Sequence, residues 1–198
     1  MGSSRDLLRD LSLALASYRS HLDEAGQGLL PATPHDPGSG LKPWVDRRAV
    51  EWLLGALGPD APAEARARAA ALDAEFEALQ RERTDYWPRL RADLETLAET
   101  FAARGVAAAL LSSGAELLGV LAERTCIEVL REVLEPRGLV SPSLRDALAA
   151  EEAPFRAFVE RHRAAGLTLP SVEYAPARYW WLRPPEREGA QKGPTRPR

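Results

Sequence analysis

The chain is poor in cysteine, in long apolar runs and in the features of an exported protein. Its one cysteine, Cys126, excludes an intramolecular disulfide and every metal site built from several cysteines. No run of about 18 apolar residues is free of charge, so we expect no membrane span. Arg5, Asp6, Arg9 and Asp10 interrupt the N-terminus, where a secretory signal would be apolar. These absences favour a cytoplasmic protein.

The sequence also lacks the local motifs that mark a catalytic or cofactor site. The three histidines, His21, His35 and His162, fall in separate segments without the spacing of metal ligands. No G-x-G-x-x-G, G-x-x-x-x-G-K-S/T or G-x-S-x-G sequence occurs, so neither a phosphate-binding loop nor a nucleophile elbow is indicated. We therefore predict no metal, no cofactor and no catalytic residue.

The charge composition gives no global preference for a polyanionic partner. The 198 residues carry a net charge of -3, with an isoelectric point near 5.7. Arginine provides 24 of the basic residues and lysine only two, Lys42 and Lys192, while alanine, leucine and proline are abundant. This bias is typical of a GC-rich coding sequence and indicates a bacterial source.

The most informative segment is 106–135, which is rich in alanine, leucine and valine. It spans 30 residues without proline and has two internal glycines. As one helix it would extend over roughly 45 Å, beginning after Gly105 and ending before Pro136. We predict that it is the central helix of an all-α domain.

A second helix is predicted over residues 4–25, where apolar residues alternate at spacings of three and four. The stripe that they form consists of Leu8, Leu11, Leu15, Tyr18 and Leu22. Such a stripe packs against another helix, either within the chain or in a homodimer. The pattern does not decide between these two alternatives.

Proline and glycine divide the rest of the chain. Residues 26–42 read as a long loop, for which we expect mobility rather than a functional role. Further helices are predicted over 43–57, over 62–104 with a break at Pro88, and from Ser141-Pro142 with a break at Pro154. The expected fold is an all-α bundle of five or six helices around the long central helix, with residues 1–174 as one domain.

One candidate polar cluster lies on the predicted central helix. Projection of its apolar stripe at about 100° per residue brings Ser112, Glu116 and Glu123 to the buried face. A buried carboxylate can serve as a general acid or base because burial raises its pKa. Arg124 and Arg131 offer the simpler alternative of ion pairs at the surface, which we favour.

Residues 175–198 form a proline-rich tail of unusual composition, partly disordered in our interpretation. It carries a local charge of +4, against -7 for the rest of the chain. Tyr179, Trp180, Trp181 and Arg183 are candidate partner-binding residues, since aromatic and arginine side chains dominate binding sites. The alternative, which we favour for either tryptophan alone, is that the aromatic rings fasten the C-terminus onto the helical body.

Three functional hypotheses follow. The leading one is a noncatalytic helical protein-binding module, an accessory, adaptor or regulatory subunit of a bacterial cytoplasmic assembly. The second is a nucleic-acid-associated accessory subunit that uses its basic tail. The third is an enzyme or small-ligand binder with a pocket between helices near Ser112, Glu116 and Glu123.

Overall fold

The computed structural model describes residues 4–33, 36–108, 114–166 and 172–184, and these are predominantly helical. The predicted all-α class is confirmed. The described parts contain seven α-helices and three short 3-10 helices: α1 (Ser4–Gln27), α2 (Lys42–Leu57), η1 (Gly58–Asp60), α3 (Ala63–Glu82), α4 (Tyr86–Ala108), α5 (Gly114–Leu134), η2 (Glu135–Arg137), α6 (Pro142–Ala150), α7 (Glu152–Ala164) and η3 (Ala177–Leu182). None of these helices has the length and apolar character needed to cross a membrane.

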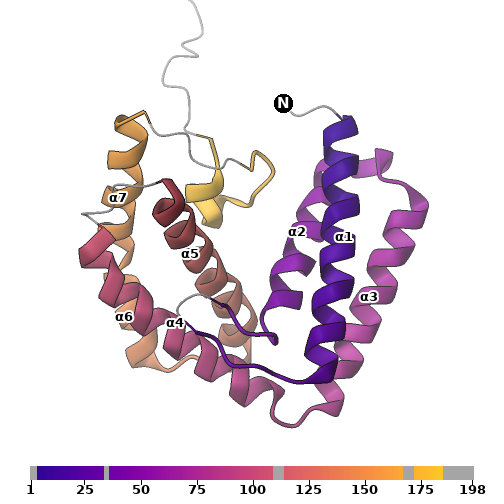
Figure 1. Cartoon of the computed structure of the whole chain (residues 1–198), viewed down its shortest axis with the longest axis horizontal. Coiled ribbons are helices and arrows are strands. Elements are labelled where there is room, and N and C mark those ends of the chain that lie inside the picture. The colour runs from indigo at the N-terminus through magenta and orange to yellow at the C-terminus, as the bar shows by residue number, and fades with distance from the viewer. Residues whose placement is uncertain (1–3, 34–35, 109–113, 167–171, 185–198) are drawn as a thin grey trace, which may run out of the picture.

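Helices α1, α2 and α3 lie side by side and form the right-hand part of the molecule in Figure 1. The predicted stripe of α1 faces these neighbours, with Leu11, Leu15, Tyr18 and Leu22 buried. Tyr18 Oη donates a hydrogen bond to Asp73 Oδ1 of α3 at 2.9 Å. The stripe therefore packs within the chain, and a homodimer through α1 would have to use another face of the helix.

The loop between α1 and α2 is held by buried polar contacts. The Ser39 hydroxyl accepts a hydrogen bond from the Leu30 N–H at 2.7 Å and donates one to the Gly28 carbonyl at 2.8 Å. Asp93 of α4 accepts a hydrogen bond from the Ala32 N–H at 2.8 Å. Ser39 and Asp93 are both buried. These contacts do not support the mobility expected from the proline and glycine content.

The buried Asp93 carboxyl group predicts a pH dependence of stability. Burial raises the pKa of Asp93, although the Ala32 N–H and Arg89 favour its charged form. Because the folded protein then binds this proton more readily than the unfolded chain, the stabilising contribution is lost as pH rises through the folded-state pKa. We expect Asp93→Asn to remove this decline from the free energy of unfolding, measured with urea between about pH 4 and pH 7. The exposed Asp85→Asn is the control, and equal pH profiles for both variants would contradict the prediction.

Residues 62–104 fold as two helices, α3 and α4, joined by the turn at residues 83–85. The interruption comes before Pro88 rather than at it. Pro88 lies in the first turn of α4, where the missing N–H removes no hydrogen bond of the helix. The two helices diverge from this turn, and α4 leads to the left-hand part of the molecule in Figure 1.

The prediction of one helix over 106–135 is wrong. Helix α4 continues through Gly105 to Ala108, and α5 begins at Gly114. A lone glycine inside a helix costs only about 1 kcal/mol, so Gly105 is a weak stop signal. Residues 109–113, which separate the two helices, lie outside the described residues.

Helix α5 nevertheless has the central position that was predicted for the longer helix. It packs against α4, α2 and η3. Ile127, Leu130 and Leu134 of the predicted stripe are fully buried. The core thus forms around the second half of the predicted segment.

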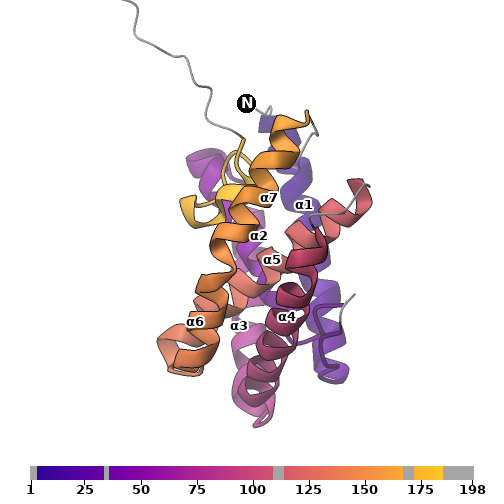
Figure 2. The same cartoon turned by 90° about the vertical axis from the view of Figure 1, so that its left-hand side faces the viewer.

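Helices α6 and α7 follow one another along one side of the molecule (Figure 2) and contact α4. Ser141 caps α6, since its hydroxyl accepts a hydrogen bond from the Leu144 N–H at 3.2 Å. The predicted break falls at Glu151, and Pro154 lies in the first turn of α7. Proline again occupies the position where it disturbs a helix least.

Candidate functional site

The aromatic residues of η3 lie inside the protein. Figure 1 shows η3 beside α5. The aromatic rings of η3 contact Trp52 of α2 and Phe155 of α7. Tyr179 is 0% exposed and packs edge-on against the Trp52 ring, with 4.7 Å between ring centroids. Trp181 is 1% exposed, contacts the Phe155 ring at 5.5 Å and donates its Nε1–H to Thr125 Oγ1 at 3.2 Å. Neither ring offers a surface to a partner in this arrangement.

Trp180 and Arg183 lie closer to solvent. Trp180 is half-buried, donates its Nε1–H to Glu152 Oε1 at 3.0 Å and lies under the Arg156 guanidinium at 4.1 Å. Arg183 is exposed, and its carbonyl accepts a hydrogen bond from Arg163 at 2.7 Å. The contacts of η3 favour the alternative in which the aromatic rings fasten the C-terminus. Partner binding through Trp180 and Arg183 stays a prediction.

A buried cluster of charges lies between α5 and η3. Glu128 is 4% exposed and accepts hydrogen bonds from Arg178 of η3 at 2.5 Å and from Arg131 at 3.2 Å. Arg124, also 4% exposed, pairs with Glu128 at 3.4 Å and with Glu152 of α7 at 2.8 Å. We expected Arg124 at the surface, and this was wrong. The cluster joins α5, α7 and η3 electrostatically.

The polar cluster predicted on the central helix lies partly outside the described residues. Ser112 is not described, and only the helical backbone of Glu116 is. Glu123 is buried. Burial raises the pKa of Cys126 to about 12, and the Glu123 carboxylate adds to the effect. The Cys126 thiol is therefore protonated near neutral pH and is a poor nucleophile, whereas the cluster itself stays a prediction.

A serine, a histidine and an aspartate meet between α1 and α2. His21 Nδ1 lies 2.6 Å from Asp46 Oδ2, and the Ser17 hydroxyl donates to Asp46 Oδ1 at 2.9 Å. In a nucleophilic triad the two ring nitrogens face the serine and the aspartate separately. Here the contact between Ser17 and His21, at 3.4 Å, involves the same Nδ1. The group links two helices and does not have the geometry of a triad.

No potential metal site accompanies these residues in the described parts of the chain, where no group of three or more His, Cys, Asp or Glu side chains could hold an ion.

The strongest candidate for a binding site is a recess near the turn between α3 and α4, which we call the basic pocket. It has a volume of about 520 Å³. Five segments contribute its lining: Trp44 and Arg47 from α2; Glu77, Gln80 and Arg81 from α3; Arg83 and Thr84 from the turn; Trp87 from α4; and Arg137 from η2. The pocket thus combines arginine and tryptophan side chains.

Among the residues that the structure describes, one arginine of the basic pocket is paired with acidic side chains, and the other three are not. Arg47 is compensated, since its Nε lies 3.3 Å from Glu51 and 3.4 Å from Asp73. Arg81, Arg83 and Arg137 line the same recess, and none of the three forms an ion pair with any residue that the structure describes. They therefore add uncompensated positive charge to a protein whose overall charge is -3.

Two of these arginines are positioned by contacts that leave their charge intact. Arg137 donates to the Val133 carbonyl at 2.6 Å and lies over the Trp87 ring at 4.2 Å from its centroid. Arg83 donates to the Gly26 carbonyl at 2.8 Å. Each guanidinium has about five N–H donors, so most remain available. The arrangement can accept an oxyanion or a carboxylate.

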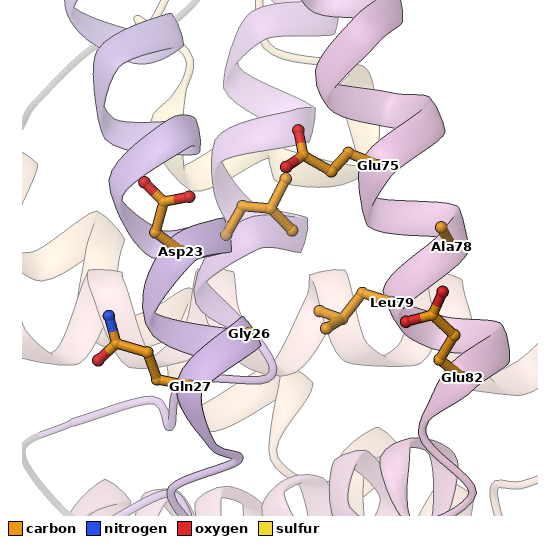
Figure 3. A pocket seen from close by; sticks show the side chains of 8 residues that line it. Asp23, Gly26, Gln27, Glu75, Ala78, Leu79 and Glu82 are labelled. Carbon is orange, nitrogen blue, oxygen red and sulfur yellow. The ribbon is translucent and has the colours of Figure 1, made fainter.

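A second hollow of about 620 Å³ lies on the other flank of α3, between α1 and α3. Figure 3 shows Asp23 of α1 with Glu75 and Glu82 of α3 around it. Arg19 compensates two of these carboxylates, at 2.7 Å from Glu75 and 3.5 Å from Asp23. The hydrogen bond from Arg19 lowers the pKa of Glu75. This hollow is acidic, and it carries less uncompensated charge than the basic pocket.

Comparisons with known proteins assign neither pocket. No family model matches the chain, and neither a curated protein nor a solved structure shows significant similarity to it.

Our reading of the sequence missed the basic pocket because its lining is drawn from separate segments. A local signal was present. Gln80, Arg81, Arg83, Thr84 and Trp87 fall within eight consecutive positions at a helix–helix turn. Arginine and tryptophan at such a turn are candidates for binding because turns lie at the surface.

Proposed function

We propose that this protein is a noncatalytic helical protein-binding module, an accessory, adaptor or regulatory subunit of a bacterial cytoplasmic assembly. The observation that carries the proposal is the basic pocket, where Arg81, Arg83 and Arg137 have no acidic partner among the described residues. Acidic side chains of a partner would supply the missing counter-charges. Trp87 adds a half-buried ring against which the partner chain can pack.

The pocket composition supports binding more than catalysis. Its lining contains arginine, tryptophan, glutamine and threonine, with Glu77 as the one carboxylate. Arginine stays protonated at all physiological pH values and does not act as a general base. These side chains are suited to recognition and orientation of a negatively charged group.

The proposal is tested by fluorescence anisotropy of a short labelled peptide rich in glutamate and aspartate. Arg81→Gln should weaken binding about tenfold, because hydrogen bonds to charged groups contribute roughly 1.5–3 kcal/mol. Arg81 is exposed and unpaired within the described chain, so the variant should fold normally. Arg68→Gln is the matched control, since Arg68 is an exposed residue of the same helix outside the pocket.

Equal weakening by Arg81→Gln and Arg68→Gln would show that the peptide responds to general charge and not to the pocket. Absence of binding by the unmodified protein would contradict the proposed function. A neutral peptide of the same length measures the background in both cases.

A further inference from the structure

The basic pocket has more positive charge than one carboxylate can compensate. Arg81, Arg83 and Arg137 come from α3, from the turn and from η2, and all three line the recess without an ion pair to any described residue. A carboxylate has one negative charge and is satisfied by a single guanidinium in a bidentate contact. Two guanidinium groups would then still lack a counter-charge.

A phosphate monoester matches this set of donors better. It carries a charge of about -1.5 to -2 near pH 7 and has three strong acceptor oxygens. Arg83 and Arg137 are held by backbone carbonyls, while Arg81 is exposed and free to adjust. Thr84, exposed on the turn, adds a neutral hydroxyl donor. Arg81, Arg137 and the Thr84 hydroxyl therefore supply donors for a tetrahedral anion in the basic pocket. The Arg83 guanidinium, bound to the Gly26 carbonyl that borders the acidic hollow, adds a further positive charge nearby.

The two tryptophans of the basic pocket indicate the kind of chemical group to which the phosphate is attached. The Trp87 ring is half-buried beneath Arg137, and the Trp44 ring is buried with Arg47 over it at 5.4 Å. The pocket therefore has an apolar wall beside its donors, which suits the carbon chain of a phosphorylated side chain. We infer that the basic pocket binds a phosphorylated side chain of a protein partner, an inference that rests on the proposed protein-binding function.

The surroundings of the pocket favour a phosphoprotein over a nucleic acid. The acidic hollow with Asp23, Glu75 and Glu82 lies on the other flank of the same helix. A nucleic acid carries a row of phosphates and would be repelled where it extends towards this hollow. A single phosphorylated side chain needs only the basic pocket. The overall charge of -3 acts in the same direction.

The test uses the full chain and three labelled peptide pools of degenerate sequence, with serine, glutamate or phosphoserine fixed at the centre. We expect the phosphoserine pool to bind at least about tenfold more tightly than the glutamate pool, because it pairs with additional arginines. Arg81→Gln and Arg137→Gln should reduce this preference to about twofold or less, whereas Arg68→Gln should retain it. Circular dichroism verifies that each variant is folded.

Each other outcome overturns the inference in an identifiable way. Equal binding of the phosphoserine and glutamate pools would leave the proposed function intact and exclude phosphate recognition. If neither the phosphoserine pool nor the glutamate pool bound, both the proposed function and phosphate recognition would be contradicted. Displacement of the phosphoserine pool by a single-stranded oligonucleotide at lower concentration than by unlabelled phosphopeptide would assign the pocket to nucleic acid. Displacement by inorganic phosphate at the same concentration as by phosphopeptide would assign it to the free anion.

Discussion

Replacement of Trp181 by alanine is expected to lower the free energy of unfolding by about 3–5 kcal/mol. The ring is 1% exposed and contacts Phe155, Tyr179 and the guanidinium of Arg124, the last at 5.0 Å from the ring centroid. Its removal leaves a cavity among α5, α7 and η3 and deprives the Thr125 hydroxyl of a donor. Urea denaturation followed by circular dichroism measures the change.

The neighbouring residue provides the matched control. Trp180 is only half-buried: its ring packs against Phe155 and Trp181, and its outer side contacts Glu152 and Arg156. Trp180→Ala should therefore cost roughly 1–2 kcal/mol, less than Trp181→Ala. If Trp180→Ala and Trp181→Ala lowered the free energy of unfolding equally, η3 would not be fixed in the core as described.

The second large effect is expected for Glu128→Ala. Glu128 compensates Arg178 and Arg131, and it shares Arg124 with Glu152. Arg178 keeps Glu132 and Arg131 keeps Glu135 in this variant, so no arginine is left without a carboxylate. The variant loses the hydrogen bonds that the buried Glu128 accepts, and hydrogen bonds to charged groups contribute roughly 1.5–3 kcal/mol, so we expect a loss of about 2–3 kcal/mol. Arg124 is 4% exposed and keeps only Glu152 in the variant. Thermal and urea denaturation should both show the loss.

Glu135→Ala is the control for this variant. Glu135 forms an ion pair with Arg131 at 3.1 Å, but its side chain is 29% exposed. Ion pairs near the surface contribute about 0–1 kcal/mol, so little change is expected. A loss of stability as large as that of Glu128→Ala would show that burial does not distinguish the two carboxylates.

The sequence predicts the helices well where proline and apolar spacing agree. Pro43 marks the beginning of α2, and Gly58 follows its end, with a positive φ of 53° that glycine adopts without strain. Ser141-Pro142 gives the start of α6. The predicted helix start after Gly105 was wrong, because a lone glycine costs a helix only about 1 kcal/mol and α4 continues to Ala108.

The sites depend on contacts between distant segments, which a single sequence does not give. The pairing of Arg178 with Glu128 joins residues 50 positions apart. Arg137 reaches Trp87 only because η2 follows α5 back to the start of α4. Composition singled out the aromatic residues of the tail and left two alternatives open, and the burial of Tyr179 and Trp181 favours the one in which the rings fasten the C-terminus onto the helical body. Arginines in many separate segments gave no indication that three of them share one recess.

The five tryptophans offer the most direct test of where a partner binds. Trp44 and Trp87 line the basic pocket, whereas Trp180 and Trp181 belong to η3 and Trp52 packs against it. The measurement is a two-dimensional ¹H–¹⁵N spectrum of the indole N–H groups, recorded while the phosphoserine peptide pool is added. Binding at the pocket should shift the signals of Trp44 and Trp87 and leave those of Trp52, Trp180 and Trp181 in place. Shifts confined to Trp180 and Trp181 would contradict the pocket and assign recognition to the C-terminal segment.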